Sequence, residues 1–489
     1  RSVDAREGVS LVYSVQVAVE NEGKVLRRAG NRAVRAVRQR YCPPGLVPAS
    51  DLPPVVVGAG PAGLFCALIL AQAGVRPILL ERGQPVEQRQ RDVEDFWRTG
   101  TLNPASNVQF GEGGAGAFSD GKLNTGTRDV CHRWILGKLV EFGVPDSILI
   151  DAHPHAGTDN LHTALQRMRQ ELLRLGADIR FGHQLADLSV ADGVLTGLTV
   201  SAPEGDYFLP ARQAVLALGH SARDTVEMLH GRGVPMEAKA FAVGVRIEHR
   251  QRDMDAAQYG EFAGHPCLPV SSYKLSCHLE GGRSVFSFCV CPGGQVVAAA
   301  SEAGRTVTNG MSYYARDGEN INGGLLVNVT PADFPGTGPL GGIAFQRQLE
   351  EAAFALGGGN FHAPAQLVGD FLAGRPSAGP GKVLPTYRPG VVWTDLRRCL
   401  PDFVADSLRQ ALPLLGRRVR GFDSPDAVLT AVESRSSSPV RILRGEDRQS
   451  PEIRGLYPCG EGAGFAGGIL SAAADGIHTA EALLSALCP

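Results

Sequence analysis

Apolar positions change their spacing several times along the chain, and each spacing predicts a different element. Over residues 9–20 apolar side chains stand at every second position, which is the period of a half-buried strand. A basic stretch over 24–40 follows with the composition of a helix, and proline pairs at 43–44 and 53–54 interrupt the pattern. We therefore predict a small α+β appendage over residues 1–50.

The next segment has the pattern of a doubly wound α/β domain. Residues 54–81 read as strand, tight glycine turn, helix and strand. A second helix is predicted over 160–175 and a strand over 177–181. Short apolar runs, separated by Asp-Gly and Glu-Gly pairs, then lead to the apolar segment 214–219. This arrangement predicts a small β-meander that returns to the main sheet.

The rest of the chain divides into two parts. Residues 236–430 mix strands, Gly/Pro loops and one or two helices, which predicts a mixed α+β substrate domain. Residues 431–489 return to the glycine-rich style of the first domain. The predicted fold is thus α/β, with a discontinuous Rossmann-like domain formed by 51–235 and 431–489.

Composition and charge exclude several classes of protein. Hydrophobic residues make up 43 % and charged residues 20 % of the chain, which is a globular and not a fibrous or disordered composition. The net charge of -2 provides no overall field for nucleic acid or an anionic membrane. Ten cysteines without a secretory signal indicate reduced thiols, so we expect a cytoplasmic protein without a membrane segment.

A glycine motif follows the first predicted strand of the α/β domain. Its residues are Gly58, Ala59, Gly60, Pro61, Ala62 and Gly63. In such a G-x-G-x-x-G turn the first glycine permits the bend, the second lets the backbone approach a pyrophosphate, and the third lets helix and strand pack. Glu81 ends the second strand, where its carboxylate can accept hydrogen bonds from ribose hydroxyls. On this evidence alone the ligand is FAD or NAD.

Three later features favour FAD. They are the Glu81-Arg82 pair, the meander that ends at Gly219, and the segment 455–464. The last contains Gly460-Glu461 and resembles the second flavin motif of the glutathione-reductase and succinate-dehydrogenase superfamily. In that motif the acid holds the ribityl or phosphate part of the cofactor. Gly467, Gly468 and Ile469 would then begin a helix at the pyrimidine edge of the flavin.

Further motifs extend the likeness over nearly the whole chain. They are Asp4–Arg6, Phe110–Leu123, Gly219–Thr225, Phe241–His249, Cys289–Gly294, Thr308–Met311 and Glu433–Arg441. Together they resemble a family of uncharacterised bacterial FAD-dependent dehydrogenases, the NAD(P)/FAD-dependent oxidoreductases. The resemblance implies noncovalent FAD and a redox activity, and it specifies the cofactor more firmly than the substrate.

Residues 109–125 form a glycine-rich loop that, by analogy with related flavoproteins, passes the pyrophosphate and the flavin ring. Gly113, Gly114 and Ser119 are its candidate cofactor contacts. Lys122 is a candidate catalytic residue because an ammonium near the flavin could stabilise the reduced anion. The alternative is an ion pair with Asp120. The loop contains no cysteine, so it lacks the redox-active pair that disulfide reductases carry there.

Two further candidates lie in the predicted substrate domain or at its end. Arg435 is expected to face the flavin cavity and hold a carboxylate, with an ion pair to Glu433 as the alternative. His249 is a candidate proton donor, and a structural histidine is the competing interpretation. Cys289 and Cys291 are interpreted chiefly as buried structural thiols. No Cys/His spacing typical of a metal site occurs, so no metal is predicted.

The sequence thus predicts an FAD-dependent oxidoreductase that transfers a hydride between a small organic substrate and flavin N5. Because no second dinucleotide motif has a flanking strand and helix, the electron donor is either the substrate or NAD(P)H that docks transiently. An FAD-dependent monooxygenase is one alternative. A flavin-binding, RNA-associated factor that uses the basic stretch 24–40 is another, although nucleic acid is not the expected partner.

Overall fold

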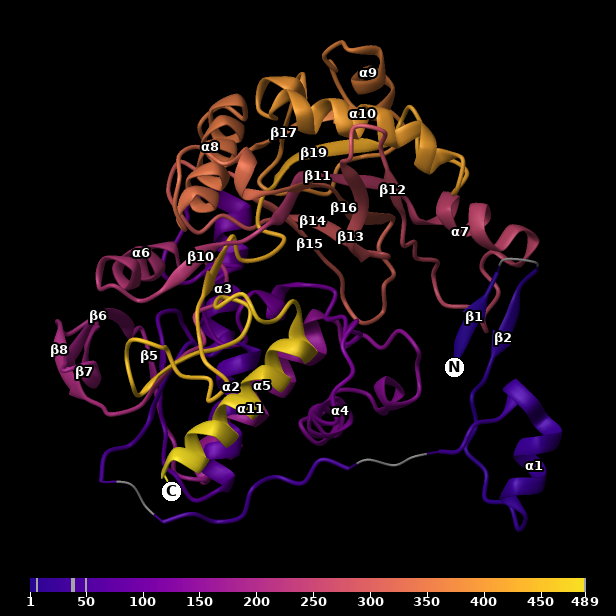
Figure 1. The fold of residues 1–489 in the computed structure, drawn as a ribbon. Coiled ribbons are helices and arrows are strands. Elements are labelled where there is room, and N and C mark those ends of the chain that lie inside the picture. The colour runs from indigo at the N-terminus through magenta and orange to yellow at the C-terminus, as the bar shows by residue number, and fades with distance from the viewer. Residues whose placement is uncertain (6–7, 37–39, 49–50, 488–489) are drawn as a thin grey trace.

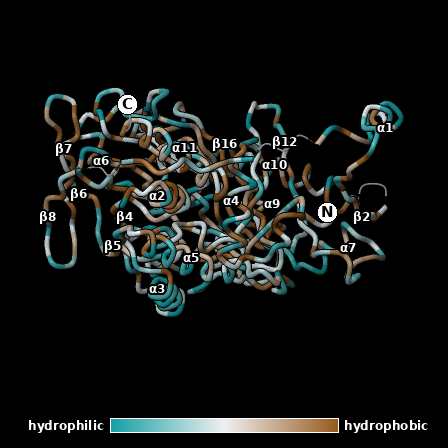
Figure 2. The backbone as a smooth tube through the Cα atoms, turned by 90° about the horizontal axis from the view of Figure 1, so that it is seen from below, coloured by the Kyte–Doolittle hydropathy of each residue, from teal (hydrophilic) through white to brown (hydrophobic). Residues whose placement is uncertain are grey.

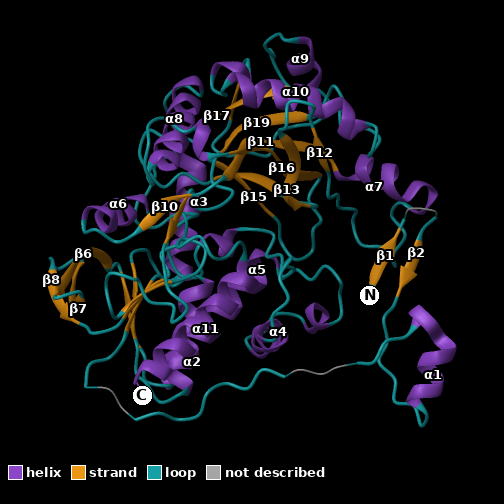
Figure 3. Ribbon diagram, viewed as in Figure 1, coloured by secondary structure: helices purple, strands orange, loops and turns teal. Residues whose placement is uncertain are grey.

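The computed structural model contains two units, each built around a sheet, and an N-terminal extension beside them (Figures 1 and 3). It describes the chain except for residues 6–7, 37–39, 49–50 and 488–489. In Figure 1 the seven-stranded sheet lies above the five-stranded sheet, with helices over the outer side of the upper sheet. This is the α/β architecture with a second sheet domain that the sequence predicts.

The lower unit contains a parallel sheet with the strand order β21-β9-β3-β4-β5. Its strands are β3 (Val55–Val57), β4 (Ile78–Glu81), β5 (Asp178–Phe181), β9 (Ala214–Leu216) and β21 (Leu456–Pro458). Apart from β5, every residue of these strands is buried, as expected for a parallel sheet that is covered on both faces. Pairing of β21 with β9 brings the C-terminal segment into the same sheet as the first glycine motif.

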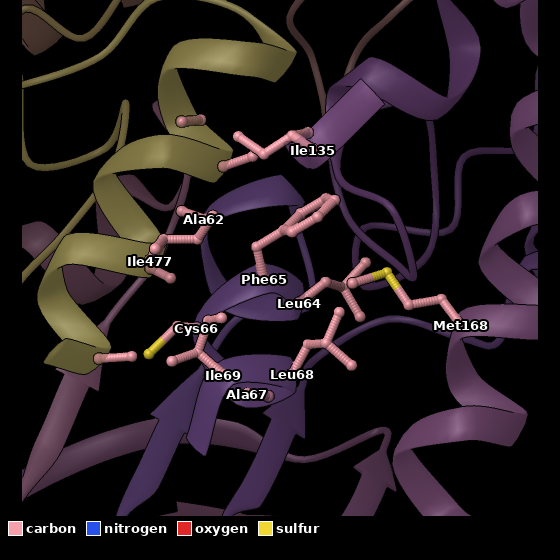
Figure 4. Packing of buried hydrophobic residues seen from close by; sticks show 14 of the residues in the cluster. Ala62, Leu64, Phe65, Cys66, Ala67, Leu68, Ile69, Ile135, Met168 and Ile477 are labelled. Carbon is pink, nitrogen blue, oxygen red and sulfur yellow. The ribbon is translucent and has the colours of Figure 1, made fainter. Parts of the chain in front are cut away.

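Two helices pack against each other below this sheet, α2 (Pro61–Gln72) and α11 (Ile469–Leu487). All of Ala62–Ala71 is buried, and Figure 4 shows Ala62 and Cys66 of α2 facing Ile477 of α11. A Cβ atom on Gly476 would lie 2.1 Å from the Ala62 oxygen, so this close approach requires glycine. In Figure 2 the chain around α2 is largely hydrophobic, whereas α3 (Val86–Thr99) is hydrophilic at the surface.

The predicted meander is present beside this sheet. It is the antiparallel sheet of β6 (Gln184–Ala191), β7 (Val194–Ser201) and β8 (Tyr207–Pro210). Three more helices complete the lower unit, namely α4 (Cys131–Glu141), α5 (Gly157–Arg174) and α6 (Arg223–Gly231). The expected helix over 160–175 and strand over 177–181 correspond to α5 and β5.

The upper unit contains a mostly antiparallel sheet with the order β12-β13-β16-β11-β19-β17-β18. Its strands are β11 (Phe241–Arg250), β12 (Ser276–His278), β13 (Ser284–Cys291), β16 (Asn320–Val329), β17 (Ala363–Leu367), β18 (Val391–Trp393) and β19 (Val428–Glu433). The helices of this unit are α7 (Gln251–Tyr259), α8 (Gly341–Leu356), α9 (Val368–Ala373) and α10 (Asp402–Gly416). Residues of α8 and α10 pack into the same apolar core as β11 and β16.

Two small ribbons complete the upper unit. One pairs β14 (Gln295–Ala298) with β15 (Thr308–Met311), and the other pairs β10 (Met236–Ala238) with β20 (Val440–Ile442). The second ribbon lies where the chain passes between the units. Strand β19 includes positions 430 and 431, so the division that the sequence predicts falls within one strand of the upper sheet.

The N-terminal extension is less regular than its pattern predicts. A hairpin of β1 (Ser2–Asp4) and β2 (Ser10–Val12) is followed by α1 (Glu22–Ala29). The predicted strand over 9–20 is wrong in length, because residues 13–19 are exposed and irregular. Alternation produces a long strand only where a sheet can receive the apolar face. The basic stretch 24–40 is helical in part, and its residues 37–39 lie outside the described residues.

Among the helices of the described chain, none combines the length and the apolar character needed to cross a lipid bilayer.

Candidate FAD-binding site

A cavity of about 2520 Å³ lies between the two units. Its lining includes both predicted cofactor motifs of the lower unit and residues of β13 and β19 of the upper unit. Ordinary ligand pockets have volumes of about 300–1,000 Å³. The cavity therefore has room for a dinucleotide and a second molecule beside it.

The first glycine motif forms the turn between β3 and α2. Gly58 has a φ of +105°, and a Cβ on it would lie 2.3 Å from the Ala217 oxygen. A Cβ on Gly63 would lie 1.8 Å from the Gly58 oxygen, so Gly63 lets the helix pack on the turn. Gly60, in contrast, lines the cavity, and its Cβ position is 3.8 Å from Gly114 Cα. The backbone at Gly60 is thus the part of the motif that a pyrophosphate would approach.

The N-terminus of α2 is open toward the same space. Pro61 and Ala62 line the cavity, and within the described residues no side chain caps the first turn. The free backbone N–H groups and the positive end of the helix dipole suit a phosphate. This arrangement fits the pyrophosphate of a dinucleotide.

Glu81 has a second role that the motif alone does not reveal. Its carboxylate accepts hydrogen bonds from the backbone N–H groups of Ala59 at 2.8 Å, Gly83 at 2.9 Å and Gly111 at 2.9 Å. Glu81 also lines the cavity, where the ribose is expected. The same side chain therefore fixes the glycine turn and the following loop beside the predicted ribose position.

Replacing Glu81 by alanine leaves three buried N–H groups without their acceptor. Each unsatisfied buried donor costs about 1–3 kcal/mol. We expect the Glu81→Ala protein to unfold at lower denaturant concentration and to retain less FAD after gel filtration. Unchanged FAD content and unchanged unfolding would contradict this role.

Arg82 and Gly219 also line the cavity. The Arg82 guanidinium donates to both carboxylate oxygens of Asp224, at 2.9 and 3.1 Å, and stands 4.3 Å above the ring of Phe110. Around the Cβ position of Gly219, within the described chain, there is open space to 4 Å. Arg82 is thus held in place by protein groups, and Gly219 leaves room for a ligand.

The loop over residues 109–125 crosses the start of α2. A Cβ on Gly114 would lie 3.1 Å from Gly60 Cα, which places the two glycine segments against each other. Gly114 and Ser119 line the cavity. Gly113 lies outside the lining, because its Cβ position faces Leu165 at 2.4 Å. A side chain at Gly113 would therefore collide with the core of the lower unit, so this position requires glycine for packing.

Sequence reasoning missed the residue that holds this loop. Arg89 of α3 is fully buried and donates to four backbone oxygens, those of Asn107, Val108, Gly111 and Glu112. Burial lowers the pKa of Arg89 to about 10. The sequence does contain a signal for the burial of Arg89, because Arg89 is spaced to lie on the same helix face as Val86, Val93 and Phe96, the buried face of α3.

The second motif follows β21. Gly460 has a φ of +74°, and its N–H donates to Asp475 at 2.7 Å. Gly460 packs against α2, since its Cβ position is 2.7 Å from Ala62 Cβ. Glu461, Gly467, Gly468 and Ile469 line the cavity. Both Gly467 and Gly468 face open space, with no atom of the described chain within 4 Å of either Cβ position.

Glu461 is the ionisable group of this second motif. Burial raises its pKa to about 7, although the N–H of Gly468 donates to its carboxylate at 3.4 Å. Near neutral pH this carboxyl group therefore exchanges a proton readily. A group with this pKa inside the cavity is suited to general acid–base chemistry.

The raised pKa predicts a pH dependence of stability. The protonated form of Glu461 is favoured in the folded state, so its contribution is complete below pH 4.5 and is lost as pH rises through 7. We expect the unfolding free energy of the wild-type apoprotein to fall over this window relative to Glu461→Gln. Parallel pH profiles of the two proteins in urea denaturation would contradict the assignment.

Lys122 lines the cavity but already has protein partners. Its ammonium group donates to the Val290 oxygen and lies 3.3 Å from Asp120. Asp120 also accepts from Arg316 and Ser312. The alternative of an ion pair with Asp120 therefore describes this lysine, which lies at the edge of the cavity.

Arg435 lines the cavity with a guanidinium that is bound elsewhere. It donates to Glu350 of α8 at 3.0 Å twice and to Ser301 at 2.6 Å. Glu433, the alternative partner considered from the sequence, instead accepts from Arg246. Arg435 thus lies at the cavity as expected, but its guanidinium is bound by Glu350 and Ser301, and the ion pair with Glu433 is not formed.

His249 lies outside the cavity lining. It is 2 % exposed and packs near Tyr273 and Phe422, and its Nε2 lies 2.8 Å from the Phe422 oxygen. Burial lowers the pKa of His249 to about 4. His249 therefore does not reach the cavity as a proton donor would, because alternation along β11 turns this side chain into the core of the upper unit.

Comparisons with known proteins agree with this geometry. Residues 51–106 match the family model described as an FAD binding domain, and residues 240–436 match the model described as FAD-dependent protein, C-terminal domain-like. A Clostridium beijerinckii protein, described as an uncharacterized protein, is 46 % identical over 489 residues, which cover 99 % of this chain and 91 % of that protein. The chain belongs to the family of this clostridial protein.

The two matched models make FAD the cofactor of this family member and class it as a flavoprotein oxidoreductase. Among solved structures, the flavin-dependent brominase Bmp2 is 13 % identical, with a TM-score of 0.42 over 90 % of this chain and 80 % of that chain. A mutant of the E. coli quinol fumarate reductase FrdA is 15 % identical, with a TM-score of 0.42 over 90 % and 71 %.

Proposed function

We propose that this flavoprotein is a dehydrogenase or reductase that transfers a hydride between a small organic substrate and N5 of FAD. The proposal is supported chiefly by the cavity of about 2520 Å³, which is lined by the cofactor loops and continues along the upper unit. A substrate bound against the upper unit would therefore lie beside the flavin. When bound, FAD supplies the two-electron chemistry.

The upper wall of the cavity indicates the class of substrate. It includes the aromatic residues Phe286, Phe288 and Tyr273 and the cationic residues Lys274 and Arg420. Aromatic side chains provide apolar contact, and cations bind anionic groups. We propose an organic anion with an apolar body. Arg435 is not part of this recognition, because Glu350 holds its guanidinium.

We further propose the domain division that the sequence predicts. Residues 51–235 and 431–489 would form one FAD-binding domain, 236–430 the substrate domain and 1–50 an appendage. Pairing of β21 with β9 supports the discontinuous domain, although β19 crosses the boundary at 430. The meander β6-β7-β8 and the Gly460-Glu461 motif support a place in the glutathione-reductase and succinate-dehydrogenase superfamily.

Anaerobic reduction tests the proposed reaction. The FAD-loaded protein is mixed under nitrogen with NADH, NADPH and a panel of aromatic and aliphatic organic acids, and the flavin absorbance is followed. We expect one compound class to bleach the flavin without oxygen and to be oxidised stoichiometrically. Substrate turnover that requires O₂ and incorporates labelled oxygen would support the monooxygenase instead.

Partners and location remain predictions. The proposed partner is a small-molecule substrate, NAD(P)H would dock transiently, and nucleic acid is not expected. Part of the basic stretch already has an acidic partner, since Arg35 donates to Glu22 at 2.6 Å. Salt-sensitive RNA binding that disappears on neutralising Arg27 and Arg28 would contradict this expectation. The cytoplasmic location predicted from the cysteine content also remains a prediction.

A further inference from the structure

The cofactor loop over 109–125 contains no cysteine, but the upper unit brings two cysteines to the same cavity. Cys289 and Cys291 stand at the end of β13, and Cys289 lines the cavity. Cys291 is fully buried directly behind it, and its thiol donates to the Cys289 oxygen at 3.3 Å. The pair therefore has one accessible member and one protected member.

The backbone around this pair departs from a regular strand. Phe288 pairs with Gly324 of β16 and Cys291 pairs with Asn322, so β13 has one residue more than its partner over this step. Cys289 itself has a φ of +41°, which is rare for a residue with a side chain. Such outliers persist where the surrounding structure enforces them, often at functional sites.

This bulge matters for the chemistry that the pair can perform. In a fully extended chain, residues two positions apart have Cα atoms separated by about 6.6–7.2 Å. A disulfide requires about 4.4–6.8 Å. Within the bulge the Cys291 sulfur lies 3.3 Å from the Cys289 backbone oxygen, so the side chain of Cys291 turns back toward Cys289.

Two cations hold the segment and surround the accessible sulfur. Arg246 donates to the Cys289 oxygen at 2.8 Å, and Lys122 donates to the oxygen of Val290. The hydrogen bond from Cys291, together with the charges of Lys122 and Arg246, lowers the pKa of Cys289 to about 5 despite its burial. Glu461 of the second flavin motif lines the same cavity as Cys289.

We propose that Cys289 and Cys291 form a redox-active dithiol that exchanges two electrons with the bound FAD. In the oxidising direction the Cys289 thiolate and the Cys291 thiol form an S–S bond, and the S–H bond of Cys291 breaks. The dithiol loses two electrons and one proton, and oxidised FAD takes up both. Cys289 at the cavity wall and the buried Cys291 thus take the place of the cysteine pair that the 109–125 loop lacks. The proposal rests on the FAD cofactor and is independent of the proposed substrate.

An anaerobic titration with dithionite tests this couple without any substrate. An FAD-loaded chain with the disulfide formed takes up about four electrons, two for the disulfide and two for the flavin. We expect Cys289→Ser and Cys291→Ser to take up about two. Cys42→Ser, which removes an exposed thiol in the N-terminal segment, is the matched control and should behave as wild type. Uptake of about two electrons by the wild type would overturn the proposal.

Thiol labelling provides a second readout that needs no variant. After oxidation of the holoprotein, iodoacetamide followed by peptide mass spectrometry should find Cys289 and Cys291 joined and unlabelled. After dithionite reduction, Cys289 should be labelled even near pH 6, because the pKa of its thiol is about 5. Two free thiols in the oxidised protein, or a bond from Cys289 to another cysteine, would refute the dithiol. Absence of flavin absorbance in the same sample would contradict the cofactor, whereas the hydride-transfer proposal is tested separately.

Discussion

The Gly60→Leu protein is expected to purify folded but with almost no bound FAD. Gly60 has a φ of -77° and a ψ of -178°, so its backbone accepts any L residue. Among the described residues, the one atom within 4 Å of its Cβ position is Gly114 Cα, at 3.8 Å, and Gly60 lies at the cavity surface. A leucine side chain there would occupy the space of the pyrophosphate without disturbing the core.

The expected effect on cofactor binding is large. We predict that FAD binding weakens by at least about 100-fold, which corresponds to about 2.7 kcal/mol. Flavin fluorescence during titration of the apoprotein measures the affinity, and circular dichroism checks the fold. The matched control is Gly137→Leu in α4, where the Cβ position has open space to 4 Å within the described chain. If Gly60→Leu and Gly137→Leu bind FAD equally well, the pyrophosphate does not lie at Gly60.

The second large effect is expected in the ion network behind the cavity. Glu350 is fully buried and accepts hydrogen bonds from Arg223 at 2.7 and 2.8 Å and from Arg435 at 3.0 Å twice. Burial alone would raise the pKa of Glu350, but the two guanidinium groups lower it well below its usual range. The three side chains come from α6, α8 and the segment after β19, so they join the lower and upper units.

Removing this one negative charge leaves two buried guanidinium groups without their main partner. Breaking a buried ion pair from one side costs about 3–5 kcal/mol. We therefore predict that Glu350→Gln lowers the unfolding free energy by about 3–5 kcal/mol in urea denaturation.

The neighbouring residue provides a matched control. Glu351 pairs with Arg305, but its side chain is 53 % exposed, so Glu351→Gln should change the unfolding free energy by about 0–1 kcal/mol. Equal effects of the two substitutions would show that the buried network does not join the units as described.

The cofactor loops could be predicted from the sequence because their function depends on local backbone geometry. At Gly58 and Gly63 a side chain would collide with the adjacent backbone, so the glycine spacing directly reports the turn. The parallel sheet was predictable for a similar reason, since short apolar strands flank these turns. Even so, Gly113 has a packing role that the motif could not separate from a contact with the cofactor.

The charged residues could not be assigned because their partners are distant in sequence. The sequence suggests Glu433, two positions away, as an ion-pair partner of Arg435. The partner in the structure is Glu350, which lies 85 positions earlier on a helix. Local spacing cannot indicate such a pairing. His249 illustrates the related limit for a strand, because alternation separates two faces without showing which face meets a ligand. The roles of Cys289 and Cys291 likewise depend on a bulge that the sequence pattern does not indicate.

Two segments, one before residue 64 and one after residue 455, are expected to bind a single FAD molecule. The flavin content of the purified full chain tests this directly: the chain is incubated with FAD and gel-filtered, then precipitated with acid, and the supernatant is analysed by chromatography. We expect about one FAD per chain, released intact on denaturation because it is held noncovalently. A chain that stays colourless after incubation, or that retains flavin mononucleotide but not FAD, would contradict this expectation.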